Sequence, residues 1–86
     1  MVIVIRIINS RSHEPIKNVK VKLDQQGRHL EAKTNEDGCV RFNGLPRGKW
    51  KVKVRNLDYR PYTKNHIFED NTETIIQVQK AWAWSA

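Results

Sequence analysis

The chain has 86 residues, which is enough for one domain and too few for two. Hydrophobic residues make up 38% of it and recur in dense clusters, which excludes a disordered chain. Lysine and arginine number 16 against 9 acidic residues, giving a net charge of +7. This charge favours an anionic partner such as nucleic acid, an acidic protein surface or an acidic glycan, although it also aids solubility.

Two further features concern the compartment. The single cysteine, Cys39, excludes an intramolecular disulfide, and a small domain without that bond favours a reducing compartment such as the cytoplasm. The apolar run at residues 1–8 is too short for a membrane span, is interrupted by Arg6 and lacks the features of a signal peptide. We therefore expect no membrane span, and we assign no compartment beyond that preference.

Apolar and polar residues alternate along much of the chain, as in strands with one buried and one solvated face. Residues 19–23 read V-K-V-K-L and residues 49–55 read K-W-K-V-K-V-R. Asn, Asp, Gly and Pro separate the alternating runs and predict turns. Seven short strands with frequent turns indicate an all-β sandwich. In chain order the predicted strands are Val2–Ile8, Val19–Asp24, His29–Thr34, Val40–Phe42, Trp50–Arg55, Thr63–Phe68 and Thr74–Gln79.

The first predicted strand is apolar on both faces. Its three isoleucines at alternate positions belong in the core, and the opposite face is then also apolar apart from Arg6. An outward apolar face is a liability unless something covers it. The outward apolar residues are Val2, Val4 and Ile8.

Four phrases, in order along the chain, resemble those of carboxypeptidase-regulatory-like and Cna B-type domains. Residues 14–21, E-P-I-K-N-V-K-V, resemble the family's entry to its second strand, and residues 34–38, T-N-E-D-G, resemble its T-x-x-D-G turn. Residues 42–50, F-N-G-L-P-R-G-K-W, resemble the phrase F-x-G-L-P-x-G-x-Y, and residues 57–59 stand where the family has x-G-Y. With the first strand, the resemblance covers nearly the whole chain. It implies a seven-stranded Greek-key β-sandwich of the transthyretin-like type.

The sequence departs from the enzymes that share this fold. Hydroxyisourate hydrolases carry catalytic His and Arg residues and end in Tyr-Arg-Gly-Ser, a signature this chain lacks. The Cna B-type isopeptide bond needs a lysine on the first strand, where this chain offers only Arg6. The resemblance therefore implies a non-catalytic module. A hydrolase activity would require the histidines and an arginine to converge in the fold.

The second and fifth strands carry cations at alternate positions, and alternate residues of a strand share one face. The resemblance implies that these two strands are neighbours in one sheet, which gives a single basic face. A solvated surface produces the same pattern, and Trp50 alternates inward, so the face lacks the exposed aromatics of single-strand nucleic-acid binders. The predicted anion-binding residues are Lys20, Lys22, Lys49, Lys51, Lys53 and Arg55.

Alternation also predicts the core. Leu45 plugs one end of the sandwich, together with Tyr59 and Ile67. The strands contribute Ile3, Ile5, Ile7, Val19, Val21, Leu23, Leu30, Ala32, Val40, Phe42, Trp50, Val52, Val54, Ile76 and Val78.

No motif in the sequence indicates a catalytic, cofactor or metal site. Cys39 follows a turn and points outward with no histidine nearby in sequence, as in a structural surface thiol. The histidines His13, His29 and His66 are far apart in sequence, so they form a metal site only if the fold gathers them.

The chain ends in a tail of residues 81–86 that carries Trp82 and Trp84, beyond a single domain at residues 1–80. Two tryptophans at a terminus favour contact with their own chain or with a partner. We therefore predict an interaction or assembly module that docks on a protein partner or self-associates through Val2, Val4, Ile8 and the tail. An anion-binding module that uses the basic face is the alternative, and no small-molecule substrate or cofactor is expected.

Overall fold

The computed structural model describes residues 1–81, which form seven strands and no helix. Within that range no helix is present that could cross a membrane. All seven predicted strands are confirmed, and their ends differ from the predicted ones by two residues at most. The strands are β1 (Ile3–Asn9), β2 (Lys20–Gln25), β3 (Arg28–Lys33), β4 (Cys39–Phe42), β5 (Gly48–Arg55), β6 (Tyr62–Phe68) and β7 (Thr72–Val78).

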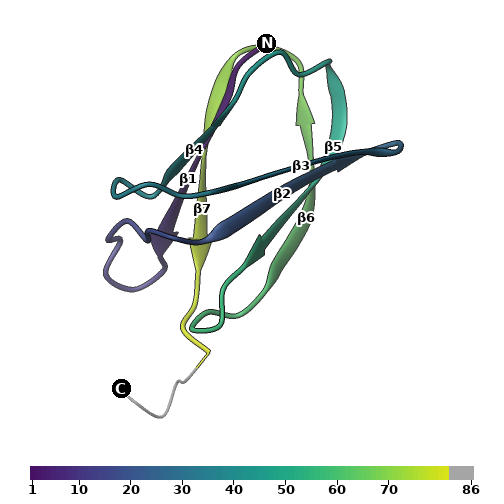
Figure 1. The fold of residues 1–86 in the computed structure, drawn as a ribbon. Coiled ribbons are helices and arrows are strands. Elements are labelled where there is room, and N and C mark those ends of the chain that lie inside the picture. The colour runs from purple at the N-terminus through teal and green to yellow at the C-terminus, as the bar shows by residue number, and fades with distance from the viewer. Residues whose placement is uncertain (82–86) are drawn as a thin grey trace.

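The strands form two sheets that pack face to face (Figure 1). The order is β4-β1-β7 in the three-stranded sheet and β3-β2-β5-β6 in the four-stranded sheet. β1 and β7 run parallel, and every other neighbouring pair is antiparallel. The arrangement confirms the predicted all-β sandwich, and it makes β2 and β5 neighbours as the resemblance implied.

The start of the chain and the end of β7 lie at opposite ends of the sandwich (Figure 1). The start of the chain lies beside the β6–β7 turn, where the backbone N–H of Thr72 donates to the carbonyl of Val2 at 3.2 Å. The end of β7 lies beside the β5–β6 loop, where the N–H of Ala81 donates to the carbonyl of Asp58 at 3.0 Å. We call this second end, residues 56–61 with residues 79–81, the β5–β6 pole.

The residues that alternation placed inside form the core between the sheets. Trp50 has no exposed surface, and its indole Nε1 donates to the carbonyl of Pro46 at 3.2 Å. Leu45 is buried and closes one end, as predicted. The other confirmed core residues are Ile3, Ile5, Ile7, Val19, Val21, Leu23, Val40, Phe42, Val52, Val54, Ile76 and Val78.

The prediction for β3 is wrong at Leu30, which is 38% exposed. Leu30 pairs with Leu23 and therefore faces the same side of the sheet as the core. However, β3 is an edge strand, and the opposing sheet has one strand fewer, so less of the inner side of β3 is covered. Ala32 on the same strand is only half-buried for the same reason.

The prediction for β6 is wrong at Ile67, which is 69% exposed. Ile67 pairs with Lys49, an outward residue of β5, so it faces solvent. The next residue, Phe68, turns inward and is buried in its place. Tyr59 is half-buried against the core, and Ile16 is a buried residue that alternation did not predict.

The turn between β3 and β4 requires glycine at one position. Gly38 has a φ of 73°, and a Cβ at this position would lie 2.7 Å from the carbonyl oxygen of Ile7 on β1. The carbonyl of Gly38 accepts a hydrogen bond from the N–H of Ile7 at 2.8 Å. The side-chain oxygen of Asn35 accepts from the N–H groups of Asp37 and Cys39, which closes the turn. The Asp37-Gly38 turn therefore packs directly against the three-stranded sheet.

Candidate functional site

A basic face covers the outer side of the four-stranded sheet. The register sets Lys20 of β2 opposite Arg55 of β5, and Lys22 opposite Lys53. All six predicted cations therefore lie on one side of two adjacent strands, although half of them, Lys20, Lys22 and Lys53, are partly buried. We use the name basic face for Lys20, Lys22, Lys49, Lys51, Lys53, Arg55 and one further residue, Lys33.

Lys33 is the residue of this face that sequence reasoning missed. It lies on the edge strand β3, and its partner in the register is Lys20. Alternation placed Leu30 and Ala32 inward and thus Lys33 outward, but the sequence gave no indication that Lys33 lies opposite Lys20. The pairing with β2 extends the basic face across three strands.

Two carboxylates lie within the basic face and neutralise part of it. Lys20 Nζ lies 3.7 Å from Glu31 Oε2, and Lys53 Nζ lies 3.2 Å from Asp24 Oδ2. His29 Nδ1 lies 2.7 Å from Asp24 Oδ1, and hydrogen bonds from His29 first and Lys53 second lower the pKa of Asp24. In the part of the chain that the structure describes, the cations with no carboxylate within 4.0 Å include Lys22, Lys49, Lys51 and Arg55.

Like charges face each other directly across the strands of this face. Lys20 stands between Lys33 and Arg55, and Lys22 stands opposite Lys53. Like charges in opposed positions destabilise a sheet, by up to about 1 kcal/mol per pair. The arrangement therefore opposes folding slightly, and at the same time it produces a positive potential that attracts anions.

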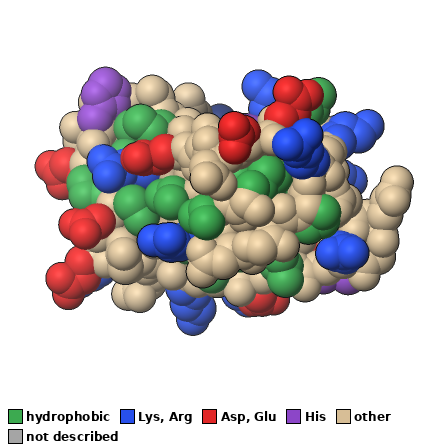
Figure 2. All heavy atoms as spheres, turned by 90° about the horizontal axis from the view of Figure 1, so that it is seen from above, with side chains coloured by type: hydrophobic (Ala, Val, Ile, Leu, Met, Phe, Trp, Pro, Cys, Tyr) green, Lys and Arg blue, Asp and Glu red, His purple; other side chains and the backbone are tan. Residues whose placement is uncertain are grey.

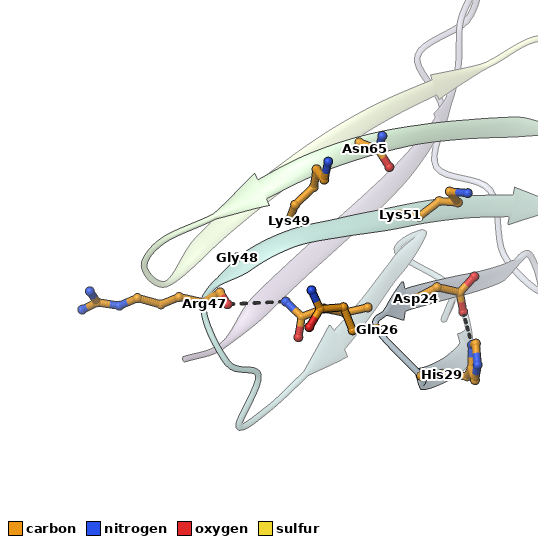
Figure 3. Close-up of a pocket in the computed structure, with 10 residues that line it drawn as sticks. Asp24, Gln26, His29, Arg47, Gly48, Lys49, Lys51 and Asn65 are labelled. Carbon is orange, nitrogen blue, oxygen red and sulfur yellow. Dashed lines mark hydrogen bonds and ion pairs between the residues drawn. The ribbon is translucent and has the colours of Figure 1, made fainter.

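A shallow hollow of about 650 Å³ lies at one end of the basic face (Figure 3). Lys49 and Lys51 of β5 line it, together with Asp24 and His29 from the β2–β3 hairpin. Arg47 contributes its carbonyl oxygen, which accepts a hydrogen bond from the side chain of Gln25 at 3.4 Å. The mixture of cations, a carboxylate and amides indicates a polar surface contact rather than an enclosed ligand site.

The apolar residues exposed near the basic face are aliphatic. Ile67 of β6 lies beside Lys49 of β5. Leu57, which is 95% exposed, lies in the β5–β6 loop. Trp50 is fully buried. Among residues 1–81, the large hydrophobic side chains that are exposed include no aromatic one, so this range provides no exposed platform for stacking bases.

The outer face of the three-stranded sheet carries the predicted partner-binding residues of β1. Val2, Val4 and Ile8 are half-buried, because β1 is the central strand and its neighbours shield its flanks. Ile75 of β7 is 58% exposed and pairs with Arg6, between Val4 and Ile8 along the sheet. The sequence analysis placed Ile76 in the core but did not name its outward neighbour Ile75 among the partner-binding residues, because it did not show that β7 lies beside β1.

Arg6 interrupts this apolar face and organises the polar groups on it. Its Nε donates a hydrogen bond to Cys39 Sγ at 3.4 Å, and its Nη2 lies 3.6 Å from Glu73 Oε1. The three residues come from β1, β4 and β7. Cys39 therefore lies on the outer side of the sheet, as predicted. Figure 2, a view from the end where the chain begins, shows charged side chains of both signs interspersed with apolar ones.

The predicted tail residues Trp82 and Trp84 lie outside the described residues. The chain that leads to them passes through the β5–β6 pole, where Lys80 pairs with Tyr59. Val2 lies at the other end of the sandwich, beside Thr72.

The histidines do not converge. His13 lies in the β1–β2 loop, His29 lies on the outer side of β3, and His66 faces the inner side of β6, where it pairs with Trp50. The hydroxyl of Tyr62 lies 2.9 Å from His66 Nε2, and burial lowers the pKa of His66, with the nearby charge of Lys64 adding to the effect. Within residues 1–81 no group of three or more His, Cys, Asp or Glu side chains is placed to hold a metal ion. The convergence that a hydrolase site requires is absent from this range.

The strand order and the two packed sheets define a transthyretin-like β-sandwich domain. More specifically, the chain belongs to the carboxypeptidase regulatory-like domain family, whose model matches residues 2–79. A search of the curated proteins finds no match.

Similar solved structures share the fold at low sequence identity. The group B streptococcus pilus 2b backbone protein has a TM-score of 0.82 and 14% identity over 99% of this chain and 43% of its own. The Bacillus anthracis TIE protein has a TM-score of 0.75 and 22% identity over 92% of this chain and 17% of its own. Klebsiella pneumoniae 5-hydroxyisourate hydrolase has a TM-score of 0.76 and 17% identity over 94% of this chain and 92% of its own. The chain thus spans less than half the length of the first two proteins.

Proposed function

We propose that this domain is a non-catalytic interaction or assembly module that docks on a protein partner or on a second copy. The docking surface is the outer face of the three-stranded sheet, with Val2, Val4, Ile8 and the tail residues Trp82 and Trp84. The observation that carries the proposal is Ile75, which is 58% exposed beside the half-buried apolar residues of β1. Apolar residues grouped on a sheet surface favour contact with another protein.

A likeness to a solved structure is compatible with a role in assembly. The chain resembles a pilus backbone protein over 99% of its length, although at 14% identity this likeness shows the fold alone.

The test is the substitution Ile75→Lys, with Ile67→Lys as the matched control. Both isoleucines are exposed, at 58% and 69%, but they lie on the outer faces of different sheets. Sedimentation velocity over a range of concentrations reports self-association, and quantitative pull-downs report the partners that each variant captures. We expect Ile75→Lys and deletion of residues 82–86 to lower association or capture, and Ile67→Lys to leave both unchanged. If all variants behave as the parent does, the three-stranded face is not the docking surface.

The second candidate is an anion-binding module, because Lys22, Lys49, Lys51 and Arg55 have no carboxylate within 4.0 Å in the described chain. Heparin and a duplex oligonucleotide are suitable probes. We expect binding that weakens steeply with salt and that falls when Lys49 and Lys51 are both changed to Glu. Absence of binding at low salt removes this candidate.

A further inference from the structure

The β5–β6 pole presents an apolar side chain beside uncompensated positive charge. Leu57 is 95% exposed, the highest exposure among the large hydrophobic residues described. It lines a hollow of about 410 Å³ together with Asn56, Pro61, Lys20 and Arg55. The lining of this hollow is therefore largely apolar, and it includes two cations.

The two cations that line this hollow, Lys20 and Arg55, belong to a row of three cross-strand neighbours in the basic face, all of which are cations. Lys33, Lys20 and Arg55 are consecutive across β3, β2 and β5. Neighbouring strands are about 4.8 Å apart, so the three backbone positions lie within about 10 Å. Within residues 1–81, these three residues form one ion pair, between Lys20 and Glu31 at 3.7 Å. The rows further along contain Asp24 and Glu31, so positive charge is concentrated at the Leu57 end.

We propose that this corner binds an acidic segment of a partner protein, with an aliphatic side chain of that segment in the hollow beside Leu57. Carboxylates of the segment pair with Arg55, Lys20 and Lys33 and relieve their mutual repulsion. The aliphatic side chain covers Leu57, which water otherwise surrounds. The inference goes beyond the proposed function, because it concerns a different surface and specifies the chemistry of the partner.

The chemistry of the corner favours an acidic protein over other anionic partners. The apolar residues that line the hollow, Leu57 and Pro61, are not aromatic, whereas binders of single-stranded nucleic acid stack bases on aromatic rings. A second copy of this chain carries a net charge of +7 and is repelled by the same surface.

The test measures binding of the full chain to a labelled short peptide of aspartate and glutamate with one central leucine. A second peptide with serine in place of that leucine measures the contribution of the apolar side chain. Fluorescence anisotropy at low and at moderate salt gives both affinities. We expect the leucine peptide to bind several times more tightly and both affinities to fall with salt.

Matched variants locate the site. Arg55→Glu and Lys49→Glu change the net charge equally and lie on the same face of the same strand, at opposite ends. We expect Arg55→Glu to weaken binding of the leucine peptide about tenfold, and Lys49→Glu to weaken it much less. Leu57→Ser should remove the preference for the leucine peptide, whereas Ile67→Ser should retain it. These side chains lie on the surface, and circular dichroism confirms that each variant is folded.

Three results overturn the inference. If Arg55→Glu and Lys49→Glu lose equal affinity for the leucine peptide, the whole basic face attracts the peptide without a preferred site. Equal affinity for the two peptides removes the role of the hollow. Binding to phosphatidylglycerol vesicles that depends on Leu57 and exceeds binding to the leucine peptide assigns the corner to a lipid surface. The Ile75→Lys variant should bind the leucine peptide as the parent does, so failure of the proposed function and failure of this inference are distinguishable.

Discussion

The two sides of β5 differ completely in what covers them. On the inner side Trp50, Val52 and Val54 are at most 2% exposed, and they pack between the sheets. On the outer side the same strand carries Lys49, Lys51, Lys53 and Arg55, with a carboxylate near one of the four, Lys53. The difference shows that one set of alternate residues stabilises the sandwich while the other is free to bear charge. A family can thus keep this fold while the chemistry of its outer faces changes.

The largest effect expected from this comparison is at Trp50. Replacing it with alanine removes a fully buried indole and leaves a cavity, so Trp50→Ala should lower the free energy of unfolding by about 3–5 kcal/mol. The outward neighbour Lys51 provides the control, because Lys51→Ala should change the free energy of unfolding by no more than about 0.5 kcal/mol. Urea denaturation measures both. Similar losses for the two variants would show that the two sides of β5 are not separated in this way.

A second prediction sharpens the comparison at the backbone. Gly38 and Gly27 both have positive φ, of 73° and 84°, but a Cβ at Gly38 meets the carbonyl of Ile7 at 2.7 Å and one at Gly27 meets nothing within 4 Å. The positive φ alone makes alanine unfavourable by about 1–2 kcal/mol at either site. Gly38→Ala should therefore be clearly more destabilising than Gly27→Ala in thermal unfolding. If the two variants lost equal stability, the close approach of Gly38 to β1 would make no contribution to the difference.

The sequence predicted the fold well because alternation and turn chemistry agree along most of the chain. Runs such as V-K-V-K-L leave a single choice of inward face, since a shift by one residue would bury the lysines. The errors at Leu30 and Ile67 fall on β3 and β6, the two edge strands of the four-stranded sheet. At Leu30, coverage by the opposing sheet decides burial, and that coverage depends on tertiary packing rather than on local pattern. At Ile67, the register with Lys49 sets the outward direction.

The candidate surfaces were less predictable than the core. The basic residues of β2 and β5 could be grouped because each strand alternates strictly, but Lys33 joined them only through its pairing with Lys20. Leu57 matched a family phrase and gave no sign that it would be 95% exposed. Alternation placed Ile76 inward, but only the register with β1 shows that Ile75 lies between Val4 and Ile8 on the outer face. Surface chemistry therefore depends on cross-strand neighbours, which a single strand's pattern does not contain.

The third prediction concerns His66 on the inner side of β6, a partly buried residue between the core and the solvent-exposed surface. Burial, and then the charge of Lys64, lowers the pKa of His66 below its ordinary value of 6.5. The folded state therefore binds a proton less readily than the unfolded state, so stability falls as the pH drops through about 6.5 toward the lowered pKa. The hydroxyl of Tyr62 lies 2.9 Å from Nε2 of this ring.

Thermal unfolding between pH 7.5 and pH 5, measured on the parent and on His66→Gln, tests this linkage. We expect the slope of stability against pH to become shallower in His66→Gln, because the titrating group has been removed. His13→Gln, which removes a histidine from an exposed loop, is the control for the substitution itself. An unchanged slope in His66→Gln would assign the pH dependence to other groups.

The smallest effect is expected on the outer side, where Lys33 stands opposite Lys20. Lys33→Glu turns a like-charge pair into an opposite-charge pair, so it should raise the free energy of unfolding by about 0.2–1 kcal/mol at low salt. Arg28→Glu is the matched control, because it makes the same change of charge on the same exposed strand opposite the neutral Gln25. The gain in Lys33→Glu should shrink as salt is added, because the Debye length falls to about 3 Å at 1 M. Chemical denaturation in urea, which leaves ionic strength unchanged, resolves the two variants. An equal gain in both would mean that the effect comes from net charge, and that the row Lys33, Lys20 and Arg55 carries no local repulsion for an acidic partner to relieve.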